Sequence, residues 1–155
     1  MNKSKYRNRI QLIFAGDGPQ KKKLRTYAAK HLPIQPIMKF YSRKELLDVI
    51  GSADLYVHAA EIELEAISCL EAISCGLVPV INNSPRSATK YFALDDKNLF
   101  QCNHAKDLAA KIDYWLEHPA EKEQRSLEYA DFAKQWQFDQ CMDQMEEMIL
   151  SICHH

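Results

Sequence analysis

Carboxylates are concentrated in one short stretch of the sequence, AAEIELEAISCLEAISCG, at residues 59–76. Glu61, Glu63 and Glu65 lie where a helix is predicted to begin, and Glu71 lies further along in a run of apolar or small residues. Glutamates beside a helix N-terminus can serve simply to complement the helix dipole. Glu71 does not fit that explanation, because a carboxylate among apolar residues needs a polar partner or a groove open to solvent.

The spacing of Glu63 and Glu71 suits an extended ligand that is polar at both ends. Eight residues of helix span about 12 Å, and the distance is shorter if Glu63 lies in the loop before the helix. Carboxylates accept hydrogen bonds from pairs of sugar hydroxyls, and the N–H groups at a helix N-terminus bind phosphate. A nucleotide-sugar presents a sugar, a diphosphate and a ribose in that order, so this stretch is a candidate site for such a molecule.

Short apolar segments alternate with helical patterns through most of the chain. We predict strands at residues 10–16, 36–41, 55–59, 79–83 and 99–101. Helical patterns cover residues 19–31, 43–52, the glutamate-rich stretch up to Gly76, 105–117, 120–135 and 140–152, and Ser42 with Glu45 matches a capping box. This alternation indicates an α/β fold, a Rossmann-like parallel sheet with helices on both faces and a helical C-terminus. The first strand, IQLIFAG, is predicted to be buried.

Ligands of such sheets bind beyond the carboxyl ends of the strands, where helix N-termini converge. In the loop GDGP after the first strand, Gly16 and Gly18 would let the backbone approach a phosphate. A tight turn from strand to helix explains the same glycines, and the loop lacks both the P-loop lysine and the third glycine of a dinucleotide fingerprint. His58 and Ser84 follow later strands, where each could contact a ligand or serve only in packing, turns or caps.

The composition is that of one globular domain, with 155 residues of which 46% are hydrophobic and 26% charged. No apolar run reaches the roughly 18 residues of a membrane span. Five irregularly spaced cysteines match neither a disulfide framework nor a zinc site. Reduced thiols and a cytoplasmic location are therefore expected.

Charge is distributed unevenly along the chain. Residues 1–30 contain nine Lys or Arg and one acidic residue, whereas residues 101–155 contain five Lys or Arg and eleven Asp or Glu. Solvated faces of amphipathic helices explain this pattern, as does a basic N-terminal part that faces a phosphate, an anionic lipid surface or an acidic partner. Nucleic acid is not expected, because no binding motif or interleaved stacking aromatics accompany the basic residues.

An ordered set of motifs resembles one protein family. AGDGP is followed by ELLDVIGSADLYVHAA, by the two glutamates within EIELEAISCLEAISCGLVPVI, and by LF ahead of DLAAKI. From about Ile10 to Glu117 the chain resembles retaining group 1 (family 4) glycosyltransferases of the GT-B fold, and most closely the subgroup with capsular polysaccharide and glycolipid transferases. Its Glu-x7-Glu motif corresponds to Glu63 and Glu71.

The resemblance assigns roles to individual residues. It implies that Glu63 contacts hydroxyls of the donor sugar as the catalytic glutamate, and that Glu71 holds the nucleotide ribose. The other donor-binding positions that we expect are the backbone amides of Leu64, Glu65 and Ala66, the glycines Gly16 and Gly18, and Tyr41, Arg43, His58 and Ser84. No metal site is expected, because helix N-termini and basic residues would offset the diphosphate charge.

Two departures from the family pattern stand out. The family commonly has Phe-Gly where this chain has Glu65-Ala66. Family members also carry an earlier strand and helix, with an arginine and a lysine for the diphosphate, and before them an acceptor-binding domain. We therefore predict that residues 1–155 form a single nucleotide-sugar-binding, Rossmann-like domain without the N-terminal acceptor domain and the first β-α unit.

The predicted function is that of the donor-binding domain of a hexosyltransferase. It would serve transfer from a nucleotide-sugar, expected to be a UDP-sugar, to a polysaccharide or lipid acceptor, and this chain alone would be inactive. The alternative is a nucleotide-sugar-binding or interaction module without catalysis. The expected partners are the donor and the missing acceptor-binding domain, with peripheral association of the full protein at the inner face of the membrane and no cofactor.

Overall fold

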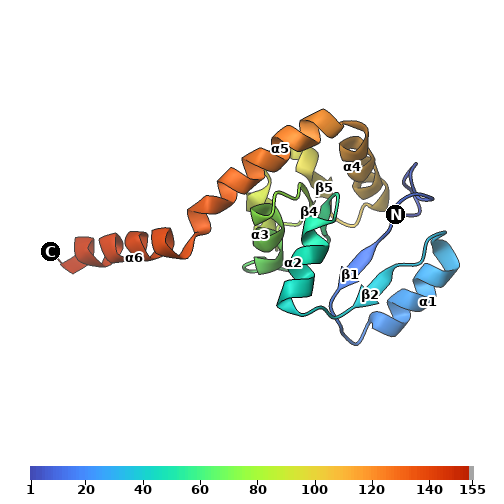
Figure 1. Ribbon diagram of the computed structural model, residues 1–155, viewed down its shortest axis with the longest axis horizontal. Helices are drawn as coiled ribbons and strands as arrows, with labels where there is room; N and C mark the ends of the chain where they lie inside the picture. The colour runs from blue at the N-terminus through green and yellow to red at the C-terminus, as the bar shows by residue number, and fades with distance from the viewer. Residues whose placement is uncertain (154–155) are drawn as a thin grey trace.

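Five short strands and six α-helices alternate along the part of the chain that the computed structural model describes, residues 1–153 (Figure 1). The strands are β1 (Ile13–Ala15), β2 (Ile37–Lys39), β3 (Tyr56–His58), β4 (Pro79–Asn83) and β5 (Leu99–Gln101). The α-helices are α1 (Lys21–His31), α2 (Arg43–Gly51), α3 (Ile67–Ser74), α4 (Ala105–Glu117), α5 (Pro119–Phe132) and α6 (Phe138–Cys153). The predicted α/β alternation is confirmed. The bounds of β4, β5 and α4 match the prediction, and the other strands are shorter than predicted.

The strands form two separate parallel ladders. β1 pairs with β2, with Ile13 opposite Ile37, and β4 pairs with β3 on one side and β5 on the other. The prediction that residues 10–16 form a buried strand was wrong, because every residue of β1 is exposed. β1 has a strand on one side only and contributes no side chain to the hydrophobic core clusters of the described residues.

The main hydrophobic core surrounds β4, where every residue except Asn83 is buried. Trp115 of α4 and Tyr129 of α5 are fully buried, and they form one cluster with Ile73 of α3 and Phe100 of β5. Helices α3, α4 and α5 therefore pack on the ladder of β3, β4 and β5, and this part of the chain is the rigid support for the loops at its strand ends.

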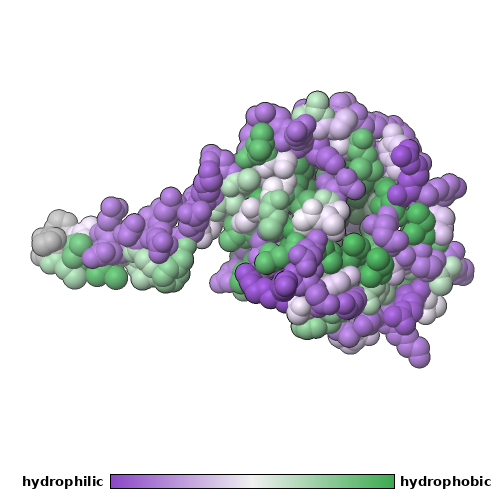
Figure 2. Space-filling view, viewed as in Figure 1, coloured by the Kyte–Doolittle hydropathy of each residue, from purple (hydrophilic) through white to green (hydrophobic). Residues whose placement is uncertain are grey.

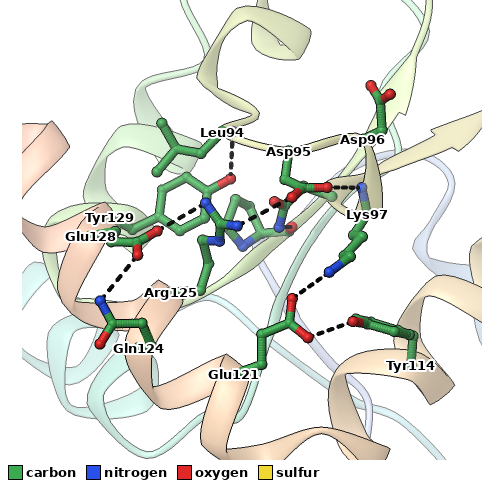
Figure 3. Close-up of polar contacts among 12 residues, drawn as sticks. Leu94, Asp95, Asp96, Lys97, Tyr114, Glu121, Gln124, Arg125, Glu128 and Tyr129 are labelled. Atoms are coloured by element: carbon green, nitrogen blue, oxygen red, sulfur yellow. Dashed lines mark hydrogen bonds and ion pairs between the residues drawn. The ribbon is translucent and has the colours of Figure 1, made fainter.

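A polar network fixes α5 to the segment before β5 (Figure 3). Glu121 of α5 accepts hydrogen bonds from Tyr114 and from Lys97, whose Nζ lies 2.6 Å from the carboxylate. The buried hydroxyl of Tyr129 accepts a hydrogen bond from the N–H of Leu94 at 3.0 Å. These contacts hold the segment between β4 and β5, which forms two short 3-10 helices, Ala88–Phe92 and Asp96–Asn98.

The ends of α2 and α3 follow directly from local sequence. At the start of α2, the N–H of Glu45 donates to Ser42 Oγ and the N–H of Ser42 donates to Glu45 Oε2 at 2.8 Å, which confirms the capping box. α3 ends at Ser74, and Gly76 just beyond it has φ of 80°, while the N–H of Leu77 donates to the carbonyl of Ala72 at 3.0 Å. This left-handed C-cap favours glycine, because a side chain there would strain the backbone.

Replacement of Gly76 by alanine is expected to destabilise the fold by about 2 kcal/mol. The left-handed backbone disfavours any Cβ, and a Cβ at this position would lie 2.9 Å from Ser126 Oγ. Gly51→Ala is the matched control, since a Cβ added at the end of α2 meets no atom within 4 Å. Urea unfolding of the two variants tests this, and an equal effect of both substitutions would contradict the role of Gly76.

Helix α6 extends away from the rest of the molecule as an arm (Figure 1). None of its residues is buried, and Met142, Met145, Ile149 and Ile152 recur on it at intervals of three and four. Figure 2 shows apolar residues along one edge of the arm and polar residues along the other. The apolar stripe therefore has no partner among the described residues.

Candidate donor-binding site

The glutamate-rich stretch divides between a loop and a helix. α3 begins only at Ile67, so Glu61, Glu63 and Glu65 lie in the loop between β3 and α3, and Glu71 lies in the second turn of the helix. The first turn of α3 contains no acidic side chain. The glutamates therefore do not complement the helix dipole from within the first turn, and the contacts of Glu63 and Glu71 differ.

Glu63 is held against the segment that follows β4. It forms a parallel bridge with Ser87, and its carbonyl accepts the N–H of Ala88 at 2.9 Å. Its carboxylate accepts the N–H of Leu64 at 3.0 Å and lies 3.9 Å from Nε2 of His58. The side chain is 34% exposed, so it can still accept hydrogen bonds from a ligand.

Glu71 is paired with Arg43 at the start of α2. Arg43 Nη1 donates to Glu71 Oε1 at 2.7 Å, and the ion pair brings the loop after β2 beside α3. The Glu71 side chain is 22% exposed, while that of Arg43 is largely in solvent. No other described residue hydrogen-bonds to this carboxylate, so Glu71 Oε2 is available to accept hydroxyl groups of a ligand.

The hydroxyl of Tyr56 on β3 lies between His58 and the start of α3. Burial raises the pKa of Tyr56 to about 12, and the negative charges of Glu63 and Glu71 contribute in the same direction. The hydroxyl lies 2.9 Å from Ser68 Oγ in the first turn of α3. Tyr56 on β3 therefore contacts α3 three residues before Glu71, and it also contacts His58, which lies beside the Glu63 carboxylate.

A chain of hydrogen bonds runs beneath this site. The Tyr56 hydroxyl lies 3.0 Å from Nδ1 of the buried His58, and Nε2 of His58 lies 3.1 Å from Thr89 Oγ1. Thr89 also accepts a hydrogen bond from Ser87 Oγ at 3.1 Å. This arrangement joins β3 to the segment after β4 that contains Ser87 and Thr89. His58 therefore lies where it can orient the Glu63 carboxylate.

The stability of the fold is expected to fall at acidic pH because of His58. Burial lowers the pKa of His58 below its ordinary value of 6.5, and the charge of Glu63 opposes this only in part. Below pH 6.5 the unfolded chain therefore binds a proton that the folded chain does not, so the free energy of unfolding decreases as the pH falls from 6.5 through the folded pKa.

His58→Gln retains a polar side chain but does not titrate, so its unfolding free energy should lose less between pH 7.5 and pH 5 than that of the unmodified chain. Urea unfolding at both pH values measures the difference. Identical pH dependence of the two proteins would contradict the assignment.

The N-terminus of α3 presents free amides. Its N-cap residue, Ala66, has a left-handed backbone with φ of 51° and provides no side-chain cap. Among the described residues, no acceptor lies within hydrogen-bonding distance of the N–H groups of residues 65–68. Leu64 differs, because its N–H is bound by the Glu63 carboxylate. Uncapped amides at a helix N-terminus form a ready site for an anionic group.

The glycine loop after β1 has no polar link to the carboxylates. Within residues 1–153, no hydrogen bond or ion pair joins residues 16–19 to Glu63 or Glu71. Asp17 instead accepts the N–H of Gly18 at 2.8 Å and the ammonium of Lys21 at 2.9 Å, and Lys21 lowers the pKa of that carboxyl. A role of Gly16 and Gly18 in donor binding therefore stays a prediction.

Three further predicted positions have contacts of their own. The Tyr41 ring lies 5.0 Å from Lys39 Nζ at the end of β2, and Glu65 is exposed without a polar partner in the described chain. Ser84 is fully buried, and its hydroxyl donates to the carbonyl of Glu61 at 2.6 Å. The Ser84 hydroxyl therefore already donates its hydrogen to hold the loop that carries Glu63.

The structure adds residues that the sequence interpretation missed, namely Tyr56 and Ser68. Tyr56 and His58 are two residues apart on β3 and so share one face of the strand, which was the available signal. Ser68 and Thr89 come from separate segments and meet this pair only through folding.

Residues 1–132 match the sequence model of a family described as glycosyl transferases group 1. The chain belongs to this family. It is also similar to a solved structure, the crystal structure of the catalytic domain of cholesterol-alpha-glucosyltransferase from Helicobacter pylori. The two chains are 50% identical with a TM-score of 0.84, over 88% of this chain and 85% of that chain. A comparison with curated proteins gives no significant match.

Family membership and the structural likeness confirm the predicted resemblance, the α/β GT-B-type fold and the identification as a glycosyltransferase domain. The motif roles of Glu63 and Glu71 stay predictions, and the structure places Glu63 in the loop before α3 and Glu71 in the second turn of that helix. Among residues 1–153, no helix combines the length and hydropathy that crossing a bilayer requires.

Proposed function

We propose that this chain binds the donor of a retaining glycosyltransferase, and that the donor is a UDP-sugar with UDP-glucose the first candidate. The observation that carries the proposal is the position of Glu63 in the loop before α3 and of Glu71 in its second turn, on either side of the free amides of residues 65–68. The similarity to an enzyme named as an alpha-glucosyltransferase supports glucose as the sugar.

In this proposal each part of the site holds one part of the donor. Glu63 accepts hydrogen bonds from hydroxyls of the sugar, and Glu71 accepts them from the ribose through Oε2, while Arg43 keeps Oε1 in place. The amides of residues 65–68 face the diphosphate. Tyr41 and Arg43 border the nucleobase.

The chemistry that the site would support is cleavage of the bond between the anomeric carbon and the diphosphate oxygen. The electron pair of that bond leaves with the nucleoside diphosphate. The oxygen of the acceptor hydroxyl forms the new bond to the same carbon, and the proton of that hydroxyl passes to the departing diphosphate oxygen. The amides at the start of α3 stabilise the negative charge that develops on the leaving group, which is how helix N-termini contribute to catalysis. These amides supply the positive character at the diphosphate, so the proposal needs no metal and no cofactor.

The acceptor is proposed to be a lipid, and a sterol is the first compound to test because the similar enzyme is named for cholesterol. An acceptor-binding domain outside residues 1–155 would hold that lipid, with the full protein on the cytoplasmic face of a membrane. The family commonly builds its donor site with further residues before the glycine loop. Binding of a nucleotide-sugar without turnover is therefore the second candidate.

Titration of the chain with UDP, UDP-glucose and GDP, followed by calorimetry and by the NMR shifts of the residue 65–68 amides, tests the proposal. UDP and UDP-glucose should bind weakly and shift those amides, and GDP should bind less well. The chain alone should not transfer glucose to cholesterol. Absence of any shift at residues 65–68 with both uridine ligands would contradict donor binding, and transfer by the isolated chain would contradict the need for another domain.

A further inference from the structure

The loop between β3 and α3 is attached to the segment that follows β4. The N–H of Ala88 donates to the carbonyl of Glu63 at 2.9 Å, and the N–H of Glu63 donates to the carbonyl of Arg86 at 3.4 Å. Ser84 Oγ donates to the carbonyl of Glu61 at 2.6 Å. The position of Glu63 therefore depends on contacts across to this segment as well as on its own loop.

Asn82 of β4 holds the first two residues of the same loop. Its side-chain Nδ2 donates to the carbonyl of Ala60 at 3.2 Å and to that of Ala59 at 3.4 Å. Within residues 1–153, no other hydrogen bond reaches these two carbonyls. Asn82 is buried and lies opposite Phe100 of β5, so the strand ladder fixes the amide that holds the loop.

Asn82 is unusual among the buried residues of β4, because the other three, Pro79, Val80 and Ile81, are apolar. Burial of an amide opposes folding unless its polar atoms are hydrogen-bonded. Asn82 Oδ1 is buried without a partner among the described residues, so only the NH₂ half of the amide is paired. An apolar β-branched residue would suit the strand better. The contacts of the NH₂ group with the loop are what such a residue could not supply.

We propose that Asn82 is a positioning residue for sugar recognition, which fixes the start of the loop and thereby the place of the Glu63 carboxylate, three residues beyond Ala60. This inference rests on the proposed donor site, in which Glu63 accepts hydroxyl groups of the sugar. Asn82 itself touches no ligand, because its side chain is buried. Glu71 belongs to α3 and is held by other contacts, so recognition of the ribose does not depend on Asn82.

Amide hydrogen exchange of the full chain tests the positioning without any ligand. Asn82→Val removes the donor and introduces a residue that suits a strand. Exchange at Ala88, whose N–H is bound by the Glu63 carbonyl, should become about tenfold faster because the loop opens more often. Exchange at Val80 in the centre of β4 should remain slow, since the ladder does not use the Asn82 side chain. Unchanged exchange at Ala88 would overturn the proposal.

Calorimetric titration of the same variant with UDP and UDP-glucose tests the link to the sugar. Asn82→Val should weaken binding of UDP-glucose about tenfold and keep that of UDP within about twofold, because only the sugar reaches Glu63. Faster exchange at Ala88 with unchanged affinity for UDP-glucose would overturn the role in sugar recognition. If the unmodified chain bound neither ligand, the proposed donor site would fail, and exchange at Ala88 would still decide whether Asn82 positions the loop.

Asn83→Val is the matched control, because Asn83 is exposed at the end of the same strand and its side chain makes no hydrogen bond within residues 1–153. It should leave the exchange of Ala88 and both affinities within about twofold of those of the unmodified chain. Equal effects of Asn82→Val and Asn83→Val would contradict a specific role for Asn82.

Asn82→Ala is the second variant, because valine is larger than asparagine and could overpack this buried position. Alanine removes the donor without added bulk and should give the same pattern of exchange and affinity as valine. Loss of slow exchange at Val80 in both variants would assign Asn82 a role in folding alone and would overturn the proposal.

Discussion

Glu71→Gln should weaken binding of UDP and of UDP-glucose to the same extent, by about 10- to 100-fold. The proposed contact of Glu71 is with the ribose, which both ligands contain, and a hydrogen bond to a charged group contributes about 1.5–3 kcal/mol. Glutamine keeps the shape of the side chain but loses the charge. Loss of the Glu71 charge leaves Arg43 without an ion-pair partner. This should reduce the stability of the fold only slightly, because the Arg43 guanidinium is largely in solvent. Calorimetric titration of both ligands measures the effect.

Glu65→Gln is the matched control for this experiment. Glu65 belongs to the same loop but is exposed and has no polar partner in the described chain. Loss of its charge beside the proposed diphosphate position should leave the affinity unchanged or raise it slightly. Equal weakening by Glu65→Gln and Glu71→Gln would indicate a general effect of charge and would contradict a specific role for Glu71.

Ala66→Val should destabilise the fold by about 2–4 kcal/mol, since it combines a left-handed backbone with an overpacked site. Ala66 has φ of 51° and is 3% exposed within the main hydrophobic core. A β-branched side chain is especially disfavoured in this conformation, and the surrounding core leaves little room for two more carbon atoms. Urea unfolding measures the loss.

Ala66→Gly is the control that separates backbone strain from packing. Glycine relieves the left-handed strain of about 1–2 kcal/mol but loses a buried methyl group and adds freedom to the unfolded chain. These terms nearly cancel, so its stability should lie within about 1 kcal/mol of the unmodified chain. A valine variant as stable as the glycine variant would show that the left-handed geometry of Ala66 is not required.

The left-handed backbone of Ala66 bears on one departure of this chain from its family, the alanine in place of the usual glycine. The family commonly has glycine at this position, and the structure retains here the backbone conformation that glycine favours. The amides of residues 65–68 consequently point away from any acceptor in the described chain. The sequence shows the substitution by alanine, but only the structure shows that the conformation is kept despite it.

Local patterns predicted the parts of the fold that depend on neighbours in the sequence. The capping box of Ser42, the end of α3 just before Gly76 and the bounds of β4 each follow from a few adjacent residues. The burial of β1 could not be predicted in this way. IQLIFAG has the composition of a buried strand, but burial depends on the strands and helices around it, and β1 has a neighbouring strand on one side only.

In the candidate site, too, only the features that depend on neighbouring residues could be predicted from the sequence. Glu71 was recognisable because it is a single carboxylate in an apolar run, and Glu63 because of its spacing from Glu71. The contact of Tyr56 with Ser68 and the ion pair between Glu71 and Arg43 join segments that are distant in the sequence. No local pattern encodes such contacts, since they exist only once β3, α2 and α3 have packed together.

Comparison of UDP and UDP-glucose binding to the unmodified chain and to Glu63→Gln tests the central claim most directly, because the two ligands differ only in the sugar that Glu63 is proposed to hold. Glutamine can still accept the N–H of Leu64, so the loop should keep its shape. The account predicts that the affinity for UDP-glucose falls about tenfold or more while the affinity for UDP stays within about twofold. Equal losses for the two ligands, or no loss for UDP-glucose, would contradict it.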